Sequence, residues 1–504
     1  MKPASAHYRR VKPTAICLFA LLACCVVVRA QSWVPGFPKT WDEAALRGLE
    51  LPRVGLGRPA GHVSADYYYR MPAVRIPKTY PVYAPDREPR GYLEWLKTQE
   101  PQEAMDFSQL ASKDDWIAAG QLVFDAPFRE ALFGPPGRTA EEWRAFSGTA
   151  LYPRAAKDGT YPWVRYWVVK KGDVRAFFTE CGSCHTRVLE DGTVVPGAQA
   201  NMNEGFWQAA TAQQASSVEP WIAQRVKDYT APWLHPNPAE AYRTMTRDQA
   251  VAIERAIPAG VRVRHGTSHL FPPKMPDLIG IADRKYLDAT GLIRHRSIAD
   301  LMRYATLVDV AESLADYDGF HPSGALPDPK QLGRFSDEAL YALALYIYSL
   351  QAPPNPNQPD ALSERGESIF HREGCASCHT PPLYTNNKLV PVAGFVVPEA
   401  HRASDDIMSR PIDTDARLTL QSRKGTGYYR VPSLKGVWYR GPFEHNGSVA
   451  TLEDWFDPAR LRDGYRPTAF AGFGVKTRGV KGHRFGLTLP LQEKKALIAF
   501  LRTL

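Results

Sequence analysis

CGSCH at residues 181–185 and CASCH at residues 375–379 are the two stretches around which this chain of 504 residues is organised. Both have the form Cys-x-x-Cys-His, the attachment motif of a c-type haem. Two thiols three residues apart can reach the two vinyl groups on one edge of a porphyrin, and the histidine that follows can bind the iron as proximal ligand. The sequence therefore predicts two covalently bound c-type haems (iron). The residues predicted to hold them are Cys181, Cys184, His185, Cys375, Cys378 and His379.

Other uses of paired cysteines fit these stretches less well. A zinc ribbon brings together two Cys pairs that lie about 15–20 residues apart, whereas these pairs lie 194 residues apart. A thioredoxin-like redox motif would accompany a strand–helix–strand pattern, and neither motif does. A disulfide within each pair would leave the two histidines unexplained.

The first thirty residues have the pattern of a secretory signal peptide. Basic residues at Arg9, Arg10 and Lys12 precede an apolar run over 15–28, and the small residue Ala30 marks a cleavage site. The run is too short for a membrane-spanning helix. We therefore expect Sec-type cleavage near Ala30 and a periplasmic or secreted protein that is not an integral membrane protein.

Cysteine usage and charge agree with export. Three of the seven cysteines, Cys17, Cys24 and Cys25, lie in the leader, where Cys24 offers lipidation as a minor alternative. The other four are all in the haem motifs, so no structural disulfide is expected. Five basic residues of the leader contribute to the formal charge of +9. The remaining excess of Lys and Arg is small and scattered, and no nucleic-acid partner is predicted.

Internal repeats divide the remainder into two halves. Residues 120–124 match residues 366–370, and the block at 276–291 matches 432–447 at a constant offset of 156. Each half closes with an amphipathic helix, and a Pro-rich stretch after Gln351 separates them. We predict an all-α fold, with two cytochrome-c-like helical haem domains from internal duplication and long loops. The predicted parts are a signal peptide at 1–30, a wrapping extension at 31–115, a first haem domain at 116–352 and a second at 353–504.

Over roughly residues 116–504 the chain resembles the bacterial di-haem cytochrome c peroxidase superfamily, which includes MauG and the rubber oxygenases. The resemblance is carried by both haem motifs, by Pro432-x-Leu434, by PFEHNG at 442–447 and by GHRFG at 482–486. It implies that the C-terminal haem is six-coordinate and transfers electrons. It also implies that the N-terminal haem meets peroxide or dioxygen.

Three departures from the family pattern bear on function. Ala289 stands where the peroxidases carry a tryptophan between the haems, so Tyr286 or Tyr304 would have to replace it in electron transfer. Lys274 stands where they carry an asparagine ligand of calcium, which argues against bound calcium. No methionine follows Met408. His483, just before the terminal helix, is therefore predicted to be the distal ligand of the C-terminal haem, with His401, Met408 and His445 next in line.

The distal side of the N-terminal haem is predicted from the same repeat. At an offset of 154, His483 matches Pro329, which cannot bind iron. Either a loop histidine, His265 or else His269, binds there, or the site is open. Peroxide cleavage also needs a base. By position after Gly291, Glu312 is the best carboxylate and Asp309 is the second.

The leading interpretation is a periplasmic di-haem oxidoreductase of the peroxidase type. Its oxidant would be peroxide or dioxygen, and its redox partner a small periplasmic electron-transfer protein. One alternative is a dioxygenase of an apolar substrate, similar to the rubber oxygenases. Another is an electron carrier in which two protein ligands close both irons.

Overall fold

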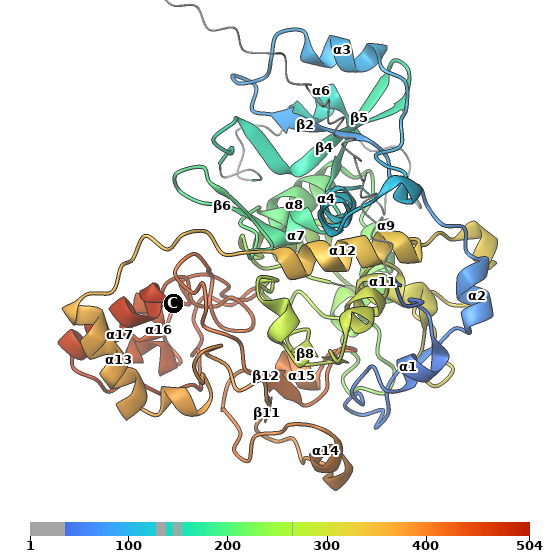
Figure 1. Cartoon of the computed structure of the whole chain (residues 1–504). Helices are drawn as coiled ribbons and strands as arrows, with labels where there is room; N and C mark the ends of the chain where they lie inside the picture. Colours follow the sequence, from blue (N-terminus) through green and yellow to red (C-terminus); the bar gives the residue numbers. More distant parts are fainter. Residues whose placement is uncertain (1–35, 128–137, 145–150, 152–153, 265) are drawn as a thin grey trace, which may run out of the picture.

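The computed structural model describes residues 36–127, 138–144, 151, 154–264 and 266–504, without the side chains of 309–313 (Figure 1). The predicted signal peptide therefore lies outside the described residues. The described helices, other than those introduced below, are α1 (Glu43–Arg47), α2 (Ala65–Arg70), α3 (Tyr92–Thr98), α6 (Ala140–Arg144), α7 (Gly182–His185), α8 (Glu204–Gln214), α9 (Glu219–Tyr229), α10 (Arg247–Arg255), α11 (Ile298–Leu314), α14 (Glu399–Ser404), α15 (Arg417–Leu420) and α16 (Leu452–Trp455). Short 3-10 turns are η1 (Phe107–Gln109), η2 (Glu240–Tyr242), η3 (Ile281–Asp283), η4 (Pro329–Gln331), η5 (Cys375–Ser377) and η6 (Pro458–Leu461).

A crossed pair of helices forms the centre of the first half, α4 (Lys113–Phe124) with α12 (Asp337–Ser349). Ser112 and Asp115 cap the start of α4 reciprocally, which satisfies two otherwise unpaired N–H groups. The two helices touch at Gly120, where a Cβ atom would lie 2.0 Å from the carbonyl oxygen of Ala342. Only glycine allows so close an approach of two backbones.

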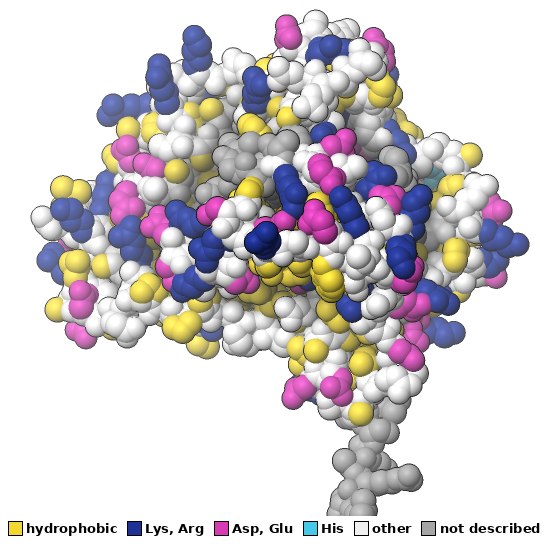
Figure 2. Space-filling model, turned by 90° about the horizontal axis from the view of Figure 1, so that it is seen from above, with side chains coloured by type: hydrophobic (Ala, Val, Ile, Leu, Met, Phe, Trp, Pro, Cys, Tyr) yellow, Lys and Arg dark blue, Asp and Glu magenta, His cyan; other side chains and the backbone are white. Residues whose placement is uncertain are grey.

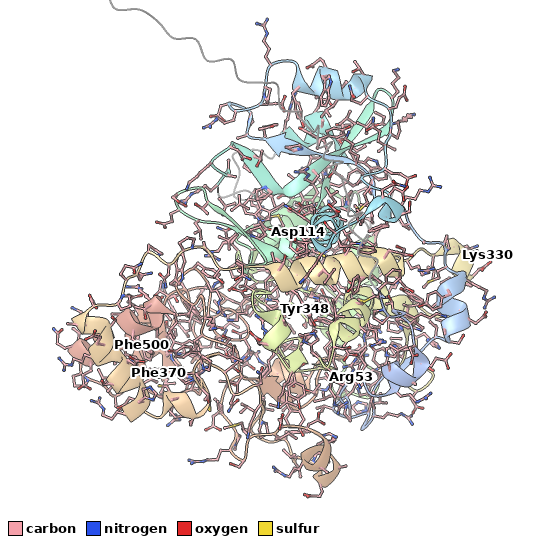
Figure 3. The ribbon with its side chains drawn as sticks, viewed as in Figure 1. Arg53, Asp114, Lys330, Tyr348, Phe370 and Phe500 are labelled. Carbon is pink, nitrogen blue, oxygen red and sulfur yellow. The ribbon has the colours of Figure 1, made fainter. Side chains whose placement is uncertain are left out.

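The second half repeats this arrangement with α13 (Ala361–Arg372) and α17 (Leu491–Thr503). A Cβ atom on Gly366 would lie 2.0 Å from the carbonyl oxygen of Ala496. Phe370 and Phe500 pack beside it with ring centres 5.3 Å apart (Figure 3). In the first half Phe124 and Tyr346 do the same at 5.3 Å.

A four-stranded antiparallel sheet contradicts the all-α prediction. Its order is β2 (Thr79–Tyr83), β4 (Thr160–Lys170), β5 (Asp173–Phe178) and β3 (Arg138–Thr139). Strand β4 alternates buried and half-buried residues, with Tyr161, Trp163 and Tyr166 in the core. Aromatic and β-branched side chains suit such a pleated surface. Strand β5 returns after Gly172, whose φ of +83° favours glycine.

The remaining strands form four small two-stranded sheets. These are β1 (Gly61–His62) with β10 (Ala315–Asp316), β6 (Thr186–Val188) with β7 (Val194–Pro196), β8 (Tyr286–Leu287) with β9 (Ile293–Arg294), and β11 (Leu389–Pro391) with β12 (Tyr428–Arg430). The segment predicted to wrap the molecule is also part of the cores. Trp41 and Tyr68 stack at 4.6 Å in the interior of the first half, and β2 is an outer strand of the large sheet.

The two halves are in contact. Tyr286 of the first half packs with Leu389 and Tyr428 of the second in one apolar cluster. On the face shown in Figure 2, acidic and basic side chains are interspersed. Within the part of the chain that the structure describes, no helix is long and apolar enough to cross a bilayer.

Candidate functional site

The second Cys-x-x-Cys-His motif lies at η5, where the chain turns after α13. Nδ1 of His379 lies 3.1 Å from the carbonyl oxygen of Pro432 and 3.3 Å from that of Tyr384. A backbone acceptor at one ring nitrogen fixes the tautomer and leaves the other nitrogen as a metal ligand. Burial lowers the pKa of His379, which keeps the ring neutral, as metal binding requires.

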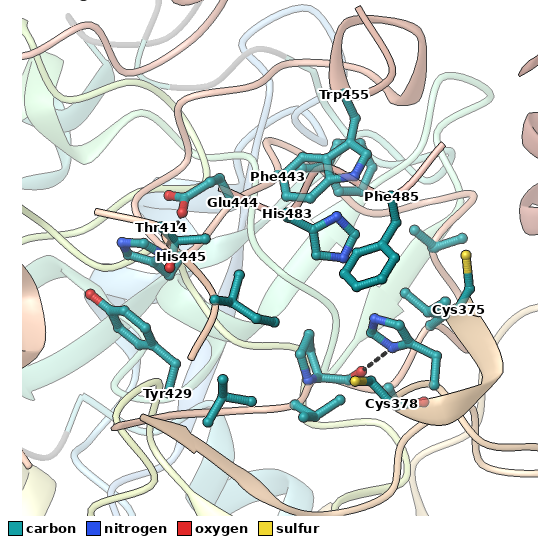
Figure 4. A pocket seen from close by; sticks show the side chains of 18 of the residues that line it. Cys375, Cys378, Thr414, Tyr429, Phe443, Glu444, His445, Trp455, His483 and Phe485 are labelled. Atoms are coloured by element: carbon teal, nitrogen blue, oxygen red, sulfur yellow. Dashed lines mark hydrogen bonds and ion pairs between the residues drawn. The ribbon is translucent and has the colours of Figure 1, made fainter. Parts of the chain in front are cut away.

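His483 lies opposite His379, across a cavity at the second motif (Figure 4). The two imidazole centres are 6.3 Å apart. An iron bonded to both rings needs centres about 6 Å apart, since each metal–nitrogen bond is about 2 Å and each ring centre lies about 1 Å behind its nitrogen. Trp455 and Phe485 pack edge-on against His483 at 5.0 and 5.4 Å. Burial lowers the pKa of His483 to about 3, so its ring is neutral.

The cavity is mostly apolar, with both cysteines of the motif at one end and a polar group at the other (Figure 4). At the polar end Nδ1 of His445 lies 2.5 Å from Oε1 of Glu444, and its ring stacks on Tyr429 at 4.1 Å. The other alternative ligands also have partners. His401 is hydrogen-bonded to the hydroxyl of Tyr428 at 2.9 Å.

The first motif, on α7, places its histidine in an equivalent way. Nδ1 of His185 lies 2.9 Å from the carbonyl oxygen of Pro276, which matches Pro432 at the offset of 156. Burial lowers the pKa of His185 to about 3. The two predicted proximal histidines are thus oriented by the same backbone contact and kept neutral by burial. Both sites fit a porphyrin iron, by their thiol pairs and by these oriented imidazoles.

Two half-buried arginines distinguish the first site. Nη1 of Arg262 lies 2.7 Å from Sγ of Cys184, and Nε of the same side chain pairs with Glu204 at 2.6 Å. Arg264 follows two residues later, and Nη1 of Arg264 lies 3.5 Å from the hydroxyl of Tyr304. These contacts could not be predicted, because no local sequence pattern connects residue 262 with residue 184.

Four cations meet at the junction of the two halves. Lys274 matches Arg430, and Arg284 matches Arg440, at the same offset of 156. Burial and the neighbouring arginines lower the pKa of Lys274 to about 8 and that of Arg284 to about 9. Asp277 pairs with Arg440 at 3.3 Å. The positive charge exceeds its nearby carboxylates, and so the cluster suits an additional anion.

Of the four candidates for the distal side of the first haem, only His269 has a described side chain. His265 and the side chains of Glu312 and Asp309 lie outside the described residues. His269 is buried, with Nε2 3.0 Å from Oε2 of Glu254, and so already has a partner. Among the described residues, no histidine ring faces His185 as His483 faces His379.

Residues near Ala289 and before the first motif complete the site. The hydroxyl of Tyr304 donates to Asp288 at 2.9 Å, and that of Tyr286 contacts Asp405, so both candidates for electron transfer have hydrogen-bonded hydroxyl groups.

Asp125, at the end of α4, is a further candidate that was not predicted from the sequence. A Cβ atom on Gly182 of the motif would lie 3.2 Å from its carboxylate. Burial raises the pKa of Asp125 to about 6, which makes it a second candidate for proton movement near the first haem.

Comparisons with known proteins agree with the predicted resemblance. No family model matches the chain. A cytochrome-c peroxidase, IdrP1 of Denitromonas iodatirespirans, is 28% identical over 166 residues, which cover 29% of this chain and 40% of the relative. The methylamine utilization protein MauG of Paracoccus denitrificans is 25% identical over 218 residues, covering 37% and 55%. The chain thus spans about half or less of the length of these curated relatives.

Solved structures give weaker likenesses. A hydrazine synthase of Kuenenia stuttgartiensis has a TM-score of 0.28 at 18% identity, covering 59% of this chain and 92% of its own. A MauG-like protein associated with microbial copper homeostasis has a TM-score of 0.29 at 18% identity, covering 57% and 90%. The sequence matches confirm that the chain is a relative of the cytochrome-c peroxidases and MauG.

Proposed function

We propose that this relative of the cytochrome-c peroxidases and MauG is a di-haem c-type oxidoreductase. In it, the N-terminal haem activates peroxide or dioxygen, and the C-terminal haem transfers electrons. The observation that carries the proposal is the difference between the two histidine environments. His379 has a second imidazole opposite it at 6.3 Å, and His185 has no such counterpart among the described residues.

At the second site, His379 and His483 are the residues that would bind the iron. A six-coordinate haem has no position for an exogenous ligand and supplies electron transfer when bound. The protein contributes orientation, through the carbonyl oxygen of Pro432, and exclusion of water, through Trp455 and Phe485.

At the first site, the chain supplies one axial ligand and a polar surround. The position that matches His483 is Pro329, a buried residue of η4 without a donor atom for iron. His269 is engaged by Glu254, and so His265 remains the candidate for a displaceable distal ligand. The base that moves a proton between peroxide oxygens is proposed to be Glu312, as the family resemblance implies.

The junction cations are proposed to hold the haem carboxylates. Lys274, Arg430 and Arg440 line the cavity of the second site, and Arg284 lies near His185. Porphyrin carboxylates lie on the edge opposite the thioether bonds, and guanidinium groups pair with carboxylates in a charge-assisted way. Since Lys274 already brings a positive charge here, calcium is not required.

The same matches support an origin by duplication, with haem domains at 116–352 and 353–504. The glycine crossings at Gly120 and Gly366 and the contacts to Pro276 and Pro432 are the same in both halves. The leader supports a periplasmic location, and a small periplasmic electron-transfer protein would be the redox partner.

The test is ligand binding to the purified holoprotein, with mass spectrometry to count the haems. We expect two haem additions and one equivalent of cyanide or carbon monoxide bound in the half-reduced or reduced state. That binding should be lost in His185→Ala, and peroxide should oxidise the reduced protein. If no exogenous ligand binds in any redox state, the protein is an electron carrier and the proposal is wrong.

A further inference from the structure

A buried polar cluster lies apart from both haem motifs, where α9 and α10 pack against residues 263–271. At its centre, Nε2 of His269 lies 3.0 Å from Oε2 of Glu254. Trp221 donates its indole N–H to Oε1 of Glu254 at 3.0 Å, and Arg225 lies 3.4 Å from the same oxygen. His269 is 1% exposed and Glu254 3% exposed. The proposed function uses none of these groups.

Two tyrosines occupy the other side of His269. The hydroxyl of Tyr229 lies 3.3 Å from Nδ1 of His269. The hydroxyl of Tyr242 accepts the backbone N–H of His269 at 2.9 Å and lies 2.8 Å from the hydroxyl of Ser268. With Nε2 donating to the Glu254 carboxylate, the neutral form of the ring has Nδ1 free to accept a hydrogen bond from the Tyr229 hydroxyl. A phenol, an imidazole and a carboxylate thus lie in one line of contacts.

The cluster adjoins the first haem site. Arg262 contacts Cys184 at 2.7 Å, and Arg264 is close enough to change the pKa of that thiol. Val263, between them, packs instead into the apolar group of Tyr229 and Tyr242. Successive side chains of an extended segment point to opposite faces. One backbone segment therefore separates the tyrosines from the surroundings of the first haem.

We propose that Tyr229 is a redox-active tyrosine that stores an oxidising equivalent produced at the first haem. The inference rests on the proposed function. In the step, one electron leaves the Tyr229 phenol for the peroxide-oxidised haem. The phenolic proton moves to Nδ1 of His269. The products are a neutral phenoxyl radical and an imidazolium ion paired with Glu254, and return of the electron and proton restores the starting state.

The surroundings of Tyr229 suit this step more than a structural one. Burial raises the pKa of Tyr229 well above its ordinary value, so its proton can leave only together with an electron or to a positioned base. His269 is that base, and Glu254 balances the charge that forms. The contacts from Tyr229 to His269 and from His269 to Glu254 thus give the phenolic proton a positioned acceptor.

The experiment is electron paramagnetic resonance of the holoprotein, frozen at intervals after mixing with hydrogen peroxide. We expect a tyrosyl radical signal in the wild type that narrows when the protein carries ring-deuterated tyrosine. Tyr229→Phe keeps the ring and should lose at least nine-tenths of the signal. Tyr242→Phe is the comparison at the neighbouring tyrosine: its hydroxyl lies 3.5 Å from Nδ1, farther than the 3.3 Å of Tyr229, and is already engaged by Ser268 at 2.8 Å, and so this variant should keep the signal. Formation in D2O should be at least twofold slower, since the proton moves with the electron.

The outcomes separate this inference from the proposed function. If peroxide changes the haem absorption spectrum but Tyr229→Phe keeps the radical signal, the inference is wrong and the proposed function stands. A signal lost in Tyr242→Phe and kept in Tyr229→Phe contradicts it equally. If peroxide changes neither the haem spectrum nor the resonance spectrum of any variant, the proposed function fails and the inference fails with it.

Discussion

The two halves of the molecule share a scaffold and differ in what they place opposite the proximal histidine. In both, two helices cross at a glycine, and the histidine bonds to the carbonyl oxygen of a matching proline. In the second half His483 completes the site, and in the first half Pro329 occupies the matching position. The difference teaches that the scaffold fixes the cofactor's orientation, while one loop position decides whether the iron can react.

The first half also has more structure between its helix and its motif. In the second half the chain runs from α13 into the motif almost directly, with Cys375 three residues after Arg372. In the first half, strands β4 and β5 intervene between α4 and α7. Strand β4 of this longer connection packs against α7, which holds the first motif.

The largest expected effect comes from removing the ligand that makes the halves differ. His483→Ala should convert the second haem from low spin to high spin and allow it to bind carbon monoxide, as we propose for the first haem. Absorption and resonance spectra of the reduced protein measure this. His401→Ala is the control, because that histidine is hydrogen-bonded to Tyr428, and it should leave the spin state unchanged. An unchanged low-spin spectrum in His483→Ala would show that the ligand lies elsewhere.

The glycine crossings test whether the scaffold is the same. Gly120→Ala and Gly366→Ala each place a methyl carbon 2.0 Å from a carbonyl oxygen of the partner helix, far inside van der Waals contact. The two helices must therefore separate. We expect each to lower the free energy of unfolding by about 3 kcal/mol or more. Denaturant unfolding measures this, with Gly464→Ala as the control, because a Cβ there has no neighbour within 4 Å. Tolerance of one substitution and not the other would show that the crossings differ.

Those features that depend on short, fixed residue spacings could be predicted from the sequence. The motifs 181–185 and 375–379 and the offset of 156 located both proximal histidines and the prolines that orient them. His483 is predicted from the absence of a methionine after Met408 and from its place before the terminal helix, and in the structure its ring centre lies 6.3 Å from that of His379. These inferences work because a haem requires certain residues at short, fixed spacings.

Other features depend on contacts that no short pattern records. The strands of the large sheet bring residue 80 beside residue 166, and Arg262 reaches Cys184 across 78 positions. His269 was considered as an iron ligand from its position alone, whereas its partner is Glu254 on α10. The aromatic run at 161–167 and the Lys171–Gly172 turn could have indicated a hairpin. The pairing partners of His269 could not have been read from the sequence.

A smaller effect is expected from the matched arginines at the junction. Arg440→Met should lower the reduction potential of the second haem, and Arg284→Met that of the first, because Arg440 lines the second cavity and Arg284 lies near His185. Each change should be roughly 50 mV, since losing a partly buried charge a few ångströms away costs the reduced iron about 1 kcal/mol. Spectroelectrochemical titration resolves the two haems. Equal changes in both potentials for either variant would contradict the assignment of one arginine to each site.

The smallest effect concerns Asp125, which the second half does not reproduce. Burial raises the pKa of this carboxyl to about 6, above its ordinary value of 3.8. A carboxyl with a raised folded-state pKa contributes stability that is complete below about pH 4 and is lost as the pH rises through about 6. Asp125→Asn removes that dependence, and so its free energy of unfolding should rise by about 1 kcal/mol relative to that of the wild type between pH 4 and pH 7, after allowance for partial exposure.

Denaturant unfolding at both pH values measures the difference, with Asp360→Asn at the start of α13 as the contrasting change. The pKa of Asp360 is lowered by its bonds to Ser363, so its contribution is lost only as the pH falls below about 4, and that variant should differ from the wild type by a nearly constant amount between pH 4 and pH 7. A parallel course for Asp125→Asn and the wild type would show that Asp125 is already ionised at low pH and is not a proton carrier for the first haem.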